Sequence, residues 1–376
     1  MRTFAELANP WVKGLGVYEP GRPIEEVARE LGFKTSDEIV KLASNENALG
    51  PSPRAMAAMH QAVDRMHIYP DGGAFYLRTA LAKKLGVQVG QILVGSGSNE
   101  ILEFLGHMFL NPEASIVMAD RAFVVYKLMA AMFGARTITV PMRNFTHDLD
   151  AMAAAIQPDT RLVFVANPNN PTGTVVDNRA LDRFLERLPD GVIAVLDEAY
   201  IELVAPEHQP DTLQWVRERR KVVVLRTFSK TYGLAGLRVG YAVAPEACIQ
   251  LMHRVRQPFN VNAMALAAAE AALGDDAYVR RTRRLVVDGL DFFGAAFDRL
   301  GLKAVPSVAN FILVEVGRGR EVFLALEREG VIVRPMDPYG LPDHIRITVG
   351  KRQENQRCVR ALERVLKARP ATRRKG

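Results

Sequence analysis

The chain has 376 residues, of which 48% are hydrophobic and 24% are charged, and its formal net charge at pH 7 is +7. This length allows two hydrophobic cores of roughly 150 residues each, and the composition is that of a globular protein. The positive charge does not indicate a nucleic-acid partner, because much of it lies in the carboxyl-terminal sequence "KARPATRRKG", which contains no acidic and no aromatic residue.

Targeting and redox signals are weak. No stretch approaches the roughly 20 apolar residues that a membrane span needs, and the start "MRTFAELANPWVKG" lacks the features of a signal peptide. The cysteines, Cys248 and Cys358, form neither a metal cluster nor a disulfide framework. The histidines show no HxH or HxxxH pairing, so we expect no metal. These features favour reduced thiols in a cytoplasmic protein.

We expect three segments along the chain. Residues 1–45 form no core of their own and are expected to pack on the smaller unit or on a partner subunit. Residues 46–262 alternate short β-branched runs with helical patterns, which indicates a large α/β domain with a mostly parallel sheet covered by helices. Its predicted strands are 91–97, 115–120, 136–141, 161–168, 192–200, 221–229 and 239–244.

The pattern changes in the last third of the chain. Residues 263–376 contain an alanine-rich helix, a long helix at 277–301, and strands within 305–316, 331–335 and 344–350. A further helix near 321–330 and a final amphipathic helix at 353–368 complete the pattern. We therefore predict a smaller α+β domain at this end.

Reactive side chains stand where the predicted strands end. Asp197 closes one apolar run, and Lys230 and Arg238 follow the next within a loop rich in glycine. In parallel sheets, ligands bind at the carboxyl ends of the strands. Each residue also has an ordinary interpretation: an aspartate after a strand often caps a helix, and a lysine on a loop is usually solvated.

Two further loops carry polar groups. The sequence "GSGSNE" opens a helix near Ser98, whose free N–H groups could bind a phosphate. The sequence "NPNNPTG" forms a rigid turn that contains Asn170. Each loop alone is more often structural. Together the loops and reactive side chains fit a ligand with a phosphate, a ring nitrogen, a ring oxygen and a group that reacts with an amine, and pyridoxal phosphate meets these requirements.

From about residue 18 to the last helix, the chain resembles the fold-type-I pyridoxal-phosphate aminotransferases, and among them the histidinol-phosphate aminotransferases. The resemblance rests on "VYEPGRP", "KLASNENALGPSP", "YPDGGAFYLRTALA", "NPNNPTG", "LDEAY", "TFSKTYGLAGLRVGY", "VIVRP" and "HIRITVG". It implies transamination of L-histidinol phosphate with 2-oxoglutarate in histidine biosynthesis, by a homodimer with shared active sites.

The resemblance also implies roles for single residues. Lys230 would bind the cofactor covalently and act as the base, and Asp197 would keep the pyridine nitrogen protonated. Asn170 and Tyr200 would contact the ring oxygen, and Phe123 would stack on the ring. The phosphate would be held by the backbone of Ser98 and Asn99, by Thr227, Ser229 and Arg238, and by Tyr69 from the partner subunit.

The resemblance also implies a set of substrate-binding residues. By resemblance, Arg346 would bind the α-carboxylate of glutamate or the phosphate of histidinol phosphate, with Asn170 beside it, and Arg334 and Tyr18 would favour the phosphate. A guanidinium suits either anion. For Arg334, a structural salt bridge is the competing interpretation.

Other functions remain as alternatives. The cofactor motifs do not separate this activity from that of an aromatic amino acid aminotransferase, and a threonine-phosphate decarboxylase is less favoured. A non-catalytic sensor would need an added DNA-binding domain, and the enzyme pattern already fills the chain. A nicotinamide-binding site is disfavoured, because "GSGSNE" and "GLAGLRVG" do not have the required glycine spacing.

Overall fold

The computed structural model describes residues 2–16 and 23–368. Its centre is a seven-stranded sheet in the order β2-β8-β7-β6-β5-β3-β4, in which β8 runs antiparallel to its neighbours and the remaining pairs are parallel. The strands are β2 (Ile92–Gly95), β3 (Ser115–Ala119), β4 (Arg136–Val140), β5 (Thr160–Ala166), β6 (Ile193–Asp197), β7 (Val222–Thr227) and β8 (Gly240–Val243). The predicted mostly parallel α/β sheet is confirmed.

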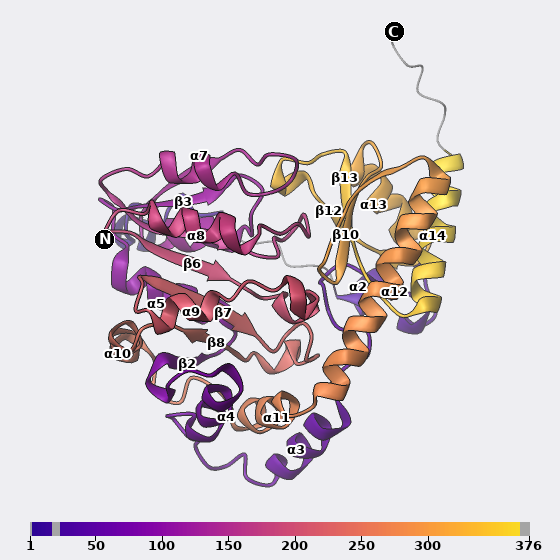
Figure 1. Ribbon diagram of the computed structural model, residues 1–376. Helices are drawn as coiled ribbons and strands as arrows, with labels where there is room; N and C mark the ends of the chain where they lie inside the picture. The colour runs from indigo at the N-terminus through magenta and orange to yellow at the C-terminus, as the bar shows by residue number, and fades with distance from the viewer. Residues whose placement is uncertain (1, 17–22, 369–376) are drawn as a thin grey trace.

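Helices cover both faces of this sheet (Figure 1). They are α3 (Pro53–Val63), α4 (Phe75–Leu85), α5 (Ser98–Phe109), α6 (Val125–Met132), α7 (Leu149–Ala154), α8 (Asn178–Glu186), α9 (Thr212–Arg217), α10 (Glu246–Val255) and α11 (Ala263–Leu273). Several begin at a side-chain cap; Asp177 and Asn262, for example, accept hydrogen bonds from backbone N–H groups three residues later. Because helices bury both faces, the central strands are apolar along almost their whole length.

The second unit is built on a four-stranded antiparallel sheet in the order β12-β13-β10-β9. Its strands are β9 (Lys303–Val305), β10 (Phe311–Glu315), β12 (Arg334–Pro335) and β13 (His344–Thr348), and its helices are α12 (Asp276–Leu300), α13 (Gly319–Arg328) and α14 (Arg352–Lys367). The strand predicted at 331–335 is divided, because β11 (Val331–Ile332) pairs with β1 (Val40–Lys41) in a separate parallel ladder. The long helix α12 runs from the larger unit to the outer edge of the smaller one (Figure 1).

The remaining elements are short. They are α1 (Phe4–Leu7), α2 (Ile24–Leu31) and the 3₁₀ turns η1 (Ser36–Glu38), η2 (Val89–Gln91), η3 (Ile201–Leu203), η4 (Pro206–His208), η5 (Ala235–Leu237) and η6 (Asp337–Tyr339). The amino-terminal segment contacts both units. Val27 in α2 packs beside Ile332 of the smaller unit, whereas the indole N–H of Trp11 donates to the backbone oxygen of Met132, at 3.1 Å, in the larger unit.

The domain limits given above stay predictions, and the packing suggests one change. The alanines of α11, such as Ala265 and Ala268, lie in the same hydrophobic core as the seven-stranded sheet. The aromatic residues Phe293 and Phe297 of α12 belong to the core of the smaller unit. We therefore propose that the boundary between the domains falls after α11 rather than before it.

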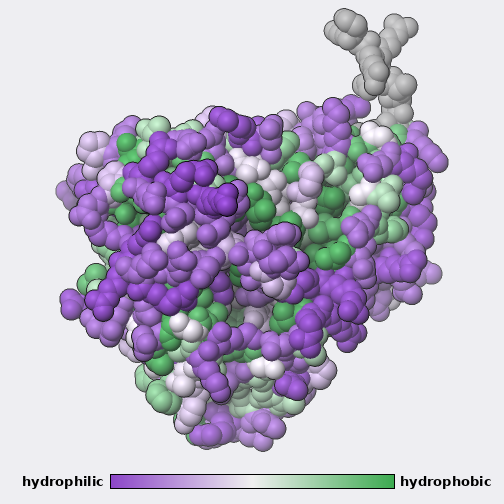
Figure 2. All heavy atoms as spheres, viewed as in Figure 1, coloured by the Kyte–Doolittle hydropathy of each residue, from purple (hydrophilic) through white to green (hydrophobic). Residues whose placement is uncertain are grey.

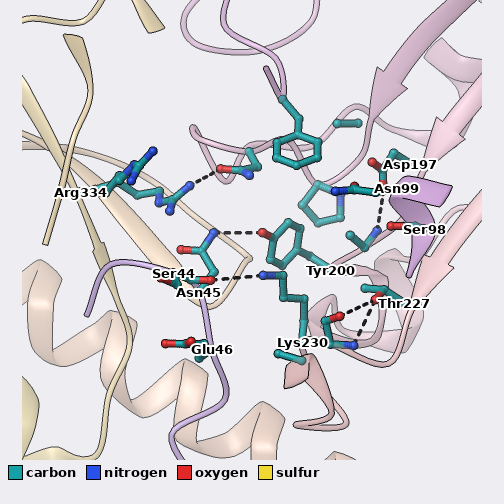
Figure 3. A pocket seen from close by; sticks show the side chains of 18 of the residues that line it. Ser44, Asn45, Glu46, Ser98, Asn99, Asp197, Tyr200, Thr227, Lys230 and Arg334 are labelled. Carbon is teal, nitrogen blue, oxygen red and sulfur yellow. Dashed lines mark hydrogen bonds between the residues drawn. The ribbon is translucent and has the colours of Figure 1, made fainter. Parts of the chain in front are cut away.

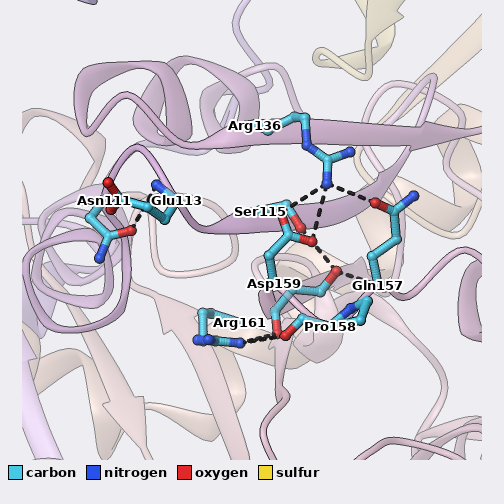
Figure 4. Close-up of polar contacts among 9 residues, drawn as sticks. Asn111, Glu113, Ser115, Arg136, Gln157, Pro158, Asp159 and Arg161 are labelled. Carbon is cyan, nitrogen blue, oxygen red and sulfur yellow. Dashed lines mark hydrogen bonds and ion pairs between the residues drawn. The ribbon is translucent and has the colours of Figure 1, made fainter.

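The amino ends of the parallel strands are held together by polar contacts (Figure 4). The guanidinium of Arg136, at the start of β4, contacts Asp159 at 2.8 Å and Gln157 at 2.7 Å just before β5. Ser115 at the start of β3 shares a hydrogen bond of 2.9 Å with Thr160. These contacts fix the edge of the sheet opposite to the one where Asp197 and Thr227 end their strands.

The surface is hydrophilic over much of the face in Figure 2, with hydrophobic residues showing between the two units and over the lower helices. In the described parts of the chain, 2–16 and 23–368, no helix has both the length and the apolar character to cross a membrane.

Candidate active site

A cavity of about 350 Å³ opens at the carboxyl ends of the central strands, between the two units. Most of the residues selected from the sequence line it: Lys230, Asp197, Tyr200, Asn170, Ser98, Asn99, Phe123, Thr227, Ser229, Arg238, Arg346 and Arg334. Figure 3 shows Lys230 and Tyr200 near the centre, with Arg334 on the opposite side from Ser98 and Thr227. The cavity therefore has one end suited to the cofactor phosphate and another end lined by arginine.

Lys230 projects into the cavity from the loop after β7. Its amine donates to the backbone oxygen of Ser44, at 3.3 Å, and lies 5.7 Å from the centre of the Tyr200 ring. Burial, and then the positive charge of Arg346, lower the pKa of Lys230 to about 8. A substantial fraction of this amine is therefore neutral near physiological pH, as a nucleophile or base requires.

Asp197 forms the floor of the cavity at the end of β6 and is only 6% exposed. Its Oδ1 accepts from the backbone N–H of Ala199 at 3.1 Å, and its Oδ2 accepts from the hydroxyl of Tyr126 at 2.6 Å. Burial raises the pKa of Asp197, and these two hydrogen bonds oppose the rise. A cationic ligand group at this position would favour the carboxylate form further.

Tyr200 and Asn170 occupy the centre of the site. The amide of Asn45 donates to the Tyr200 hydroxyl at 2.9 Å, and burial raises the pKa of Tyr200 to about 12, so the phenol is neutral and can donate to a ligand. The amide oxygen of Asn170 accepts from Arg346. Because the amide oxygen of Asn170 is engaged by Arg346, its amide nitrogen remains to donate to a ligand oxygen.

Hydroxyl and N–H donors gather around the start of α5. The Thr227 hydroxyl donates to the Ser229 hydroxyl at 2.9 Å, and the Ser229 N–H donates back to Thr227 at 3.1 Å. A Cβ atom added at Gly97 would lie 2.6 Å from Nη2 of Arg238, and one added at Gly240 would lie 2.6 Å from the backbone nitrogen of Ser98. The two glycines therefore keep this cradle open for an anion.

Two arginines stand at the other end of the cavity. Arg346 on β13 is 6% exposed, donates to the backbone oxygen of Ala43 at 2.8 Å, and lies 5.2 Å from the centre of the Phe311 ring. Arg334 on β12 is its direct partner across the antiparallel pair, which places both side chains on the same face of the sheet. The arginine pair is suited to an anionic group with more than one negative charge.

One predicted residue that the structure describes, Tyr69, does not line this cavity. Tyr69 lines a separate cavity of about 700 Å³ beside α3, α4 and α11. Its ring is 79% exposed and stacks on Phe259 at 4.7 Å between ring centres. Tyr18 lies outside the described residues. Within one subunit, the structure thus does not bring Tyr69 to the site.

The cavity also contains residues that the sequence analysis did not select. Ser44, Asn45 and Glu46 come from the "ASNEN" stretch before the larger unit, and Tyr126 comes from α6. Tyr126 follows Phe123 by three positions, but Phe123 precedes α6, so helical spacing does not link the two residues. In the described residues, no group of three or more His, Cys, Asp or Glu side chains could hold a metal ion.

A family model described as aminotransferase class I and II matches residues 37–362. The chain belongs to the class I and II aminotransferase family. It is therefore an aminotransferase, as its resemblance to that enzyme class implied.

Two curated relatives of this aminotransferase are about half identical to it. The histidinol-phosphate aminotransferase of Akkermansia muciniphila is 52% identical over 360 residues, which cover 96% of this chain and 98% of the relative. That of Moorella thermoacetica is 53% identical over 351 residues, which cover 93% of this chain and 90% of the relative. The similarity extends over nearly all of each protein.

A solved structure has the same fold. The histidinol-phosphate aminotransferase of Sinorhizobium meliloti, in complex with pyridoxal-5'-phosphate, superposes with a TM-score of 0.87. It is 28% identical in sequence, and the superposition covers 96% of this chain and 97% of the other. The expected fold-type-I architecture is therefore confirmed.

Proposed function

We propose that this aminotransferase uses pyridoxal phosphate to transfer the amino group of L-histidinol phosphate to 2-oxoglutarate, giving imidazole acetol phosphate and L-glutamate in histidine biosynthesis. One observation carries the proposal: the Lys230 amine stands in a cavity between a buried carboxylate, Asp197, and the arginine pair Arg334 and Arg346. The names of relatives that are about 50% identical over most of the chain support the substrate.

The donors of the site fit the proposed cofactor. The cradle around Ser98, Thr227 and Arg238 would hold its phosphate, Asp197 its ring nitrogen, and Asn170 and Tyr200 its ring oxygen. Phe123 lines the same cavity and would cover one face of the ring. When bound, pyridoxal phosphate supplies an aldehyde that joins covalently to amines and a ring that accepts electrons from the substrate Cα.

The protein supplies proton transfer and charge. Lys230, whose pKa is about 8, would remove the proton from the substrate Cα and return a proton during the same half-reaction. The carboxylate of Asp197 would keep the ring nitrogen protonated, and its burial strengthens this interaction because little water screens it. Tyr200 would donate its phenolic proton to the ring oxygen.

The arginine pair would recognise the anionic end of the substrate. A phosphate ester carries up to two negative charges at neutral pH, whereas the α-carboxylate of glutamate carries one. Arg346 would bind either anion, and Arg334 beside it would add a contact that mainly the phosphate uses. This arrangement accounts for two substrates of different shape reacting alternately in one cavity.

The test is a substrate panel. With 2-oxoglutarate as acceptor and added pyridoxal phosphate, kcat/KM should be highest for histidinol phosphate among histidinol phosphate, phenylalanine, tyrosine and threonine phosphate. A preference for phenylalanine or tyrosine would instead support an aromatic amino acid aminotransferase. Release of carbon dioxide from threonine phosphate would support the decarboxylase.

We also propose that the enzyme is a cytoplasmic homodimer with shared active sites. Large hydrophobic side chains are exposed at the cavity beside α3 and α4: Ile68, Tyr69 and Tyr76 line it, and Phe259 stacks on Tyr69. Met66 and Phe75, which are close to them in the chain, are exposed as well. Exposed apolar side chains gathered in this way are typical of a subunit interface. In the dimer, Tyr69 would reach the phosphate end of the partner subunit's site.

A further inference from the structure

Tyr126 has a defined relationship to the floor of the site. Its hydroxyl donates to Oδ2 of Asp197 at 2.6 Å, and its side chain is completely buried. Burial and the neighbouring Asp197 raise the pKa of Tyr126 well above its usual range. The phenol therefore remains protonated at every pH at which the enzyme could work, and it acts as a hydrogen-bond donor.

The ring of Tyr126 is held on two sides. It stacks on Phe164 of β5, with 4.7 Å between ring centres and 10° between the planes. Phe123, which lies three residues earlier and just before α6, meets it edge to face with 5.7 Å between ring centres. Because the ring cannot turn without disturbing this packing, the position of the hydroxyl is fixed relative to the sheet.

The two oxygens of Asp197 are consequently fixed as well. One accepts from the Ala199 N–H and the other from Tyr126, so the plane of the carboxylate cannot rotate without losing a hydrogen bond. The other groups that act on its charge are Glu198, the next residue along the chain, and Lys230 from the loop after β7, and Tyr200 lies nearby. Glu198 is itself paired with Arg226 at 2.7 Å.

We infer that Tyr126 is a positioning residue that orients the Asp197 carboxylate toward the ring nitrogen of the cofactor and keeps it charged in a buried site. This inference rests on the proposed function for its cofactor and deepens it by adding a residue to the same site. A hydroxyl donor suits this role, because it stabilises the carboxylate without adding a second positive charge beside the ring nitrogen.

The first experiment uses the protein without cofactor. Tyr126→Phe retains the ring and its packing but removes the donor, and this hydrogen bond stabilises the carboxylate of Asp197 more than its protonated form. The melting temperature of Tyr126→Phe should therefore fall below that of the wild type by more at pH 8 than at pH 5. This dependence on pH should disappear when both proteins also carry Asp197→Asn.

Tyr232→Phe is the matched control. Tyr232 is also buried, at 3% exposure, but it does not line the cavity. Its substitution should change the melting temperature by a similar amount at both pH values. A Tyr126→Phe effect that is independent of pH, or that persists unchanged with Asp197→Asn, would overturn the inference.

The second experiment uses the holoenzyme. The acidic limb of kcat against pH should move to higher pH in Tyr126→Phe, by about one to two units for one lost charge-assisted hydrogen bond. A loss of kcat that is equal at every pH would overturn the role toward the cofactor. Failure of the wild type to bind pyridoxal phosphate would instead refute the proposed function, and the experiment without cofactor would still test the Tyr126–Asp197 pair.

Discussion

The amine of Lys230 donates a hydrogen bond of 3.3 Å to the backbone oxygen of Ser44, a residue 186 positions earlier in the chain. Ser44 belongs to the segment that joins β1, on the smaller unit, to the larger unit. The same segment places Asn45 against Tyr200 and the Ala43 oxygen against Arg346. One short stretch thus holds reactive groups from both units in their relative positions.

Removing the Lys230 amine should abolish most of the activity but leave cofactor binding. Lys230→Ala lacks the group that moves the proton, so transamination should fall by at least about a hundred- to ten-thousandfold. The phosphate cradle is unchanged, so equilibrium dialysis should still detect bound pyridoxal phosphate. Borohydride should add the mass of the cofactor to the peptide containing Lys230 in the wild type but not in this variant, and its addition elsewhere would contradict the assignment.

The amine should titrate with a midpoint near pH 8. Because burial lowers the pKa of Lys230 to about 8, its acylation in the protein without cofactor should accelerate as pH rises through this value. In the unfolded chain, the amine of Lys230 keeps its proton up to about pH 10.4. Between the two values the unfolded state binds more protons, so this group makes stability rise with pH. Mass spectrometry would measure the acylation rate of Lys230 at each pH, with an exposed lysine such as Lys351 as the reference. A midpoint near pH 10 for Lys230 would contradict the prediction.

Neutralising Asp197 should damage the reaction more than cofactor affinity. Asp197→Asn keeps the size of the side chain but removes the charge that would hold the ring nitrogen protonated, so kcat should fall by about a hundred- to a thousandfold. The dissociation constant of pyridoxal phosphate should change much less, because Thr227, Ser229 and Arg238 remain. Near-normal turnover in this variant would rule out the proposed electrostatic role.

The two arginines should differ in their effect on the two half-reactions. Arg346→Lys should lower kcat/KM for both glutamate and histidinol phosphate, since lysine cannot reproduce the planar contacts of the guanidinium with Asn170 and Ala43. Arg334→Ala should lower kcat/KM for histidinol phosphate by about ten- to a hundredfold and affect glutamate less. Each half-reaction can be followed separately by the visible absorbance of the cofactor. Equal losses in Arg334→Ala would identify Arg334 as a structural residue.

Tyr69 should act across the dimer. Neither Tyr69→Ala nor Lys230→Ala homodimers should have appreciable activity, but a mixed dimer contains one site in which both residues are intact. Co-refolding the two variants with different affinity tags, and isolating the heterodimer, should therefore restore part of the activity. An inactive heterodimer of confirmed composition would exclude Tyr69 from the partner's site.

Local sequence was sufficient to locate the sheet and the reactive loops. All seven predicted strands of the larger unit occur as β2 to β8. Six of them are buried at most positions and are therefore apolar, a pattern that can be read directly, whereas the edge strand β4 is partly exposed. Asp197, Lys230 and Arg238 could be selected for a related reason. Asp197 ends β6, and Lys230 and Arg238 lie in the loop between β7 and β8, so all three stand at the end of the parallel strands where ligands bind.

Tertiary structure decided the contacts between distant segments. No spacing in the sequence indicates that Tyr126 donates to Asp197, that Asn45 contacts Tyr200, or that Arg334 and Arg346 are neighbours on adjacent strands. Such contacts depend on helix orientation and strand register, which are fixed by packing over the whole core rather than by local preference. The sequence thus determined which chemistry is present, and the packing of the two units determined where each charge is held.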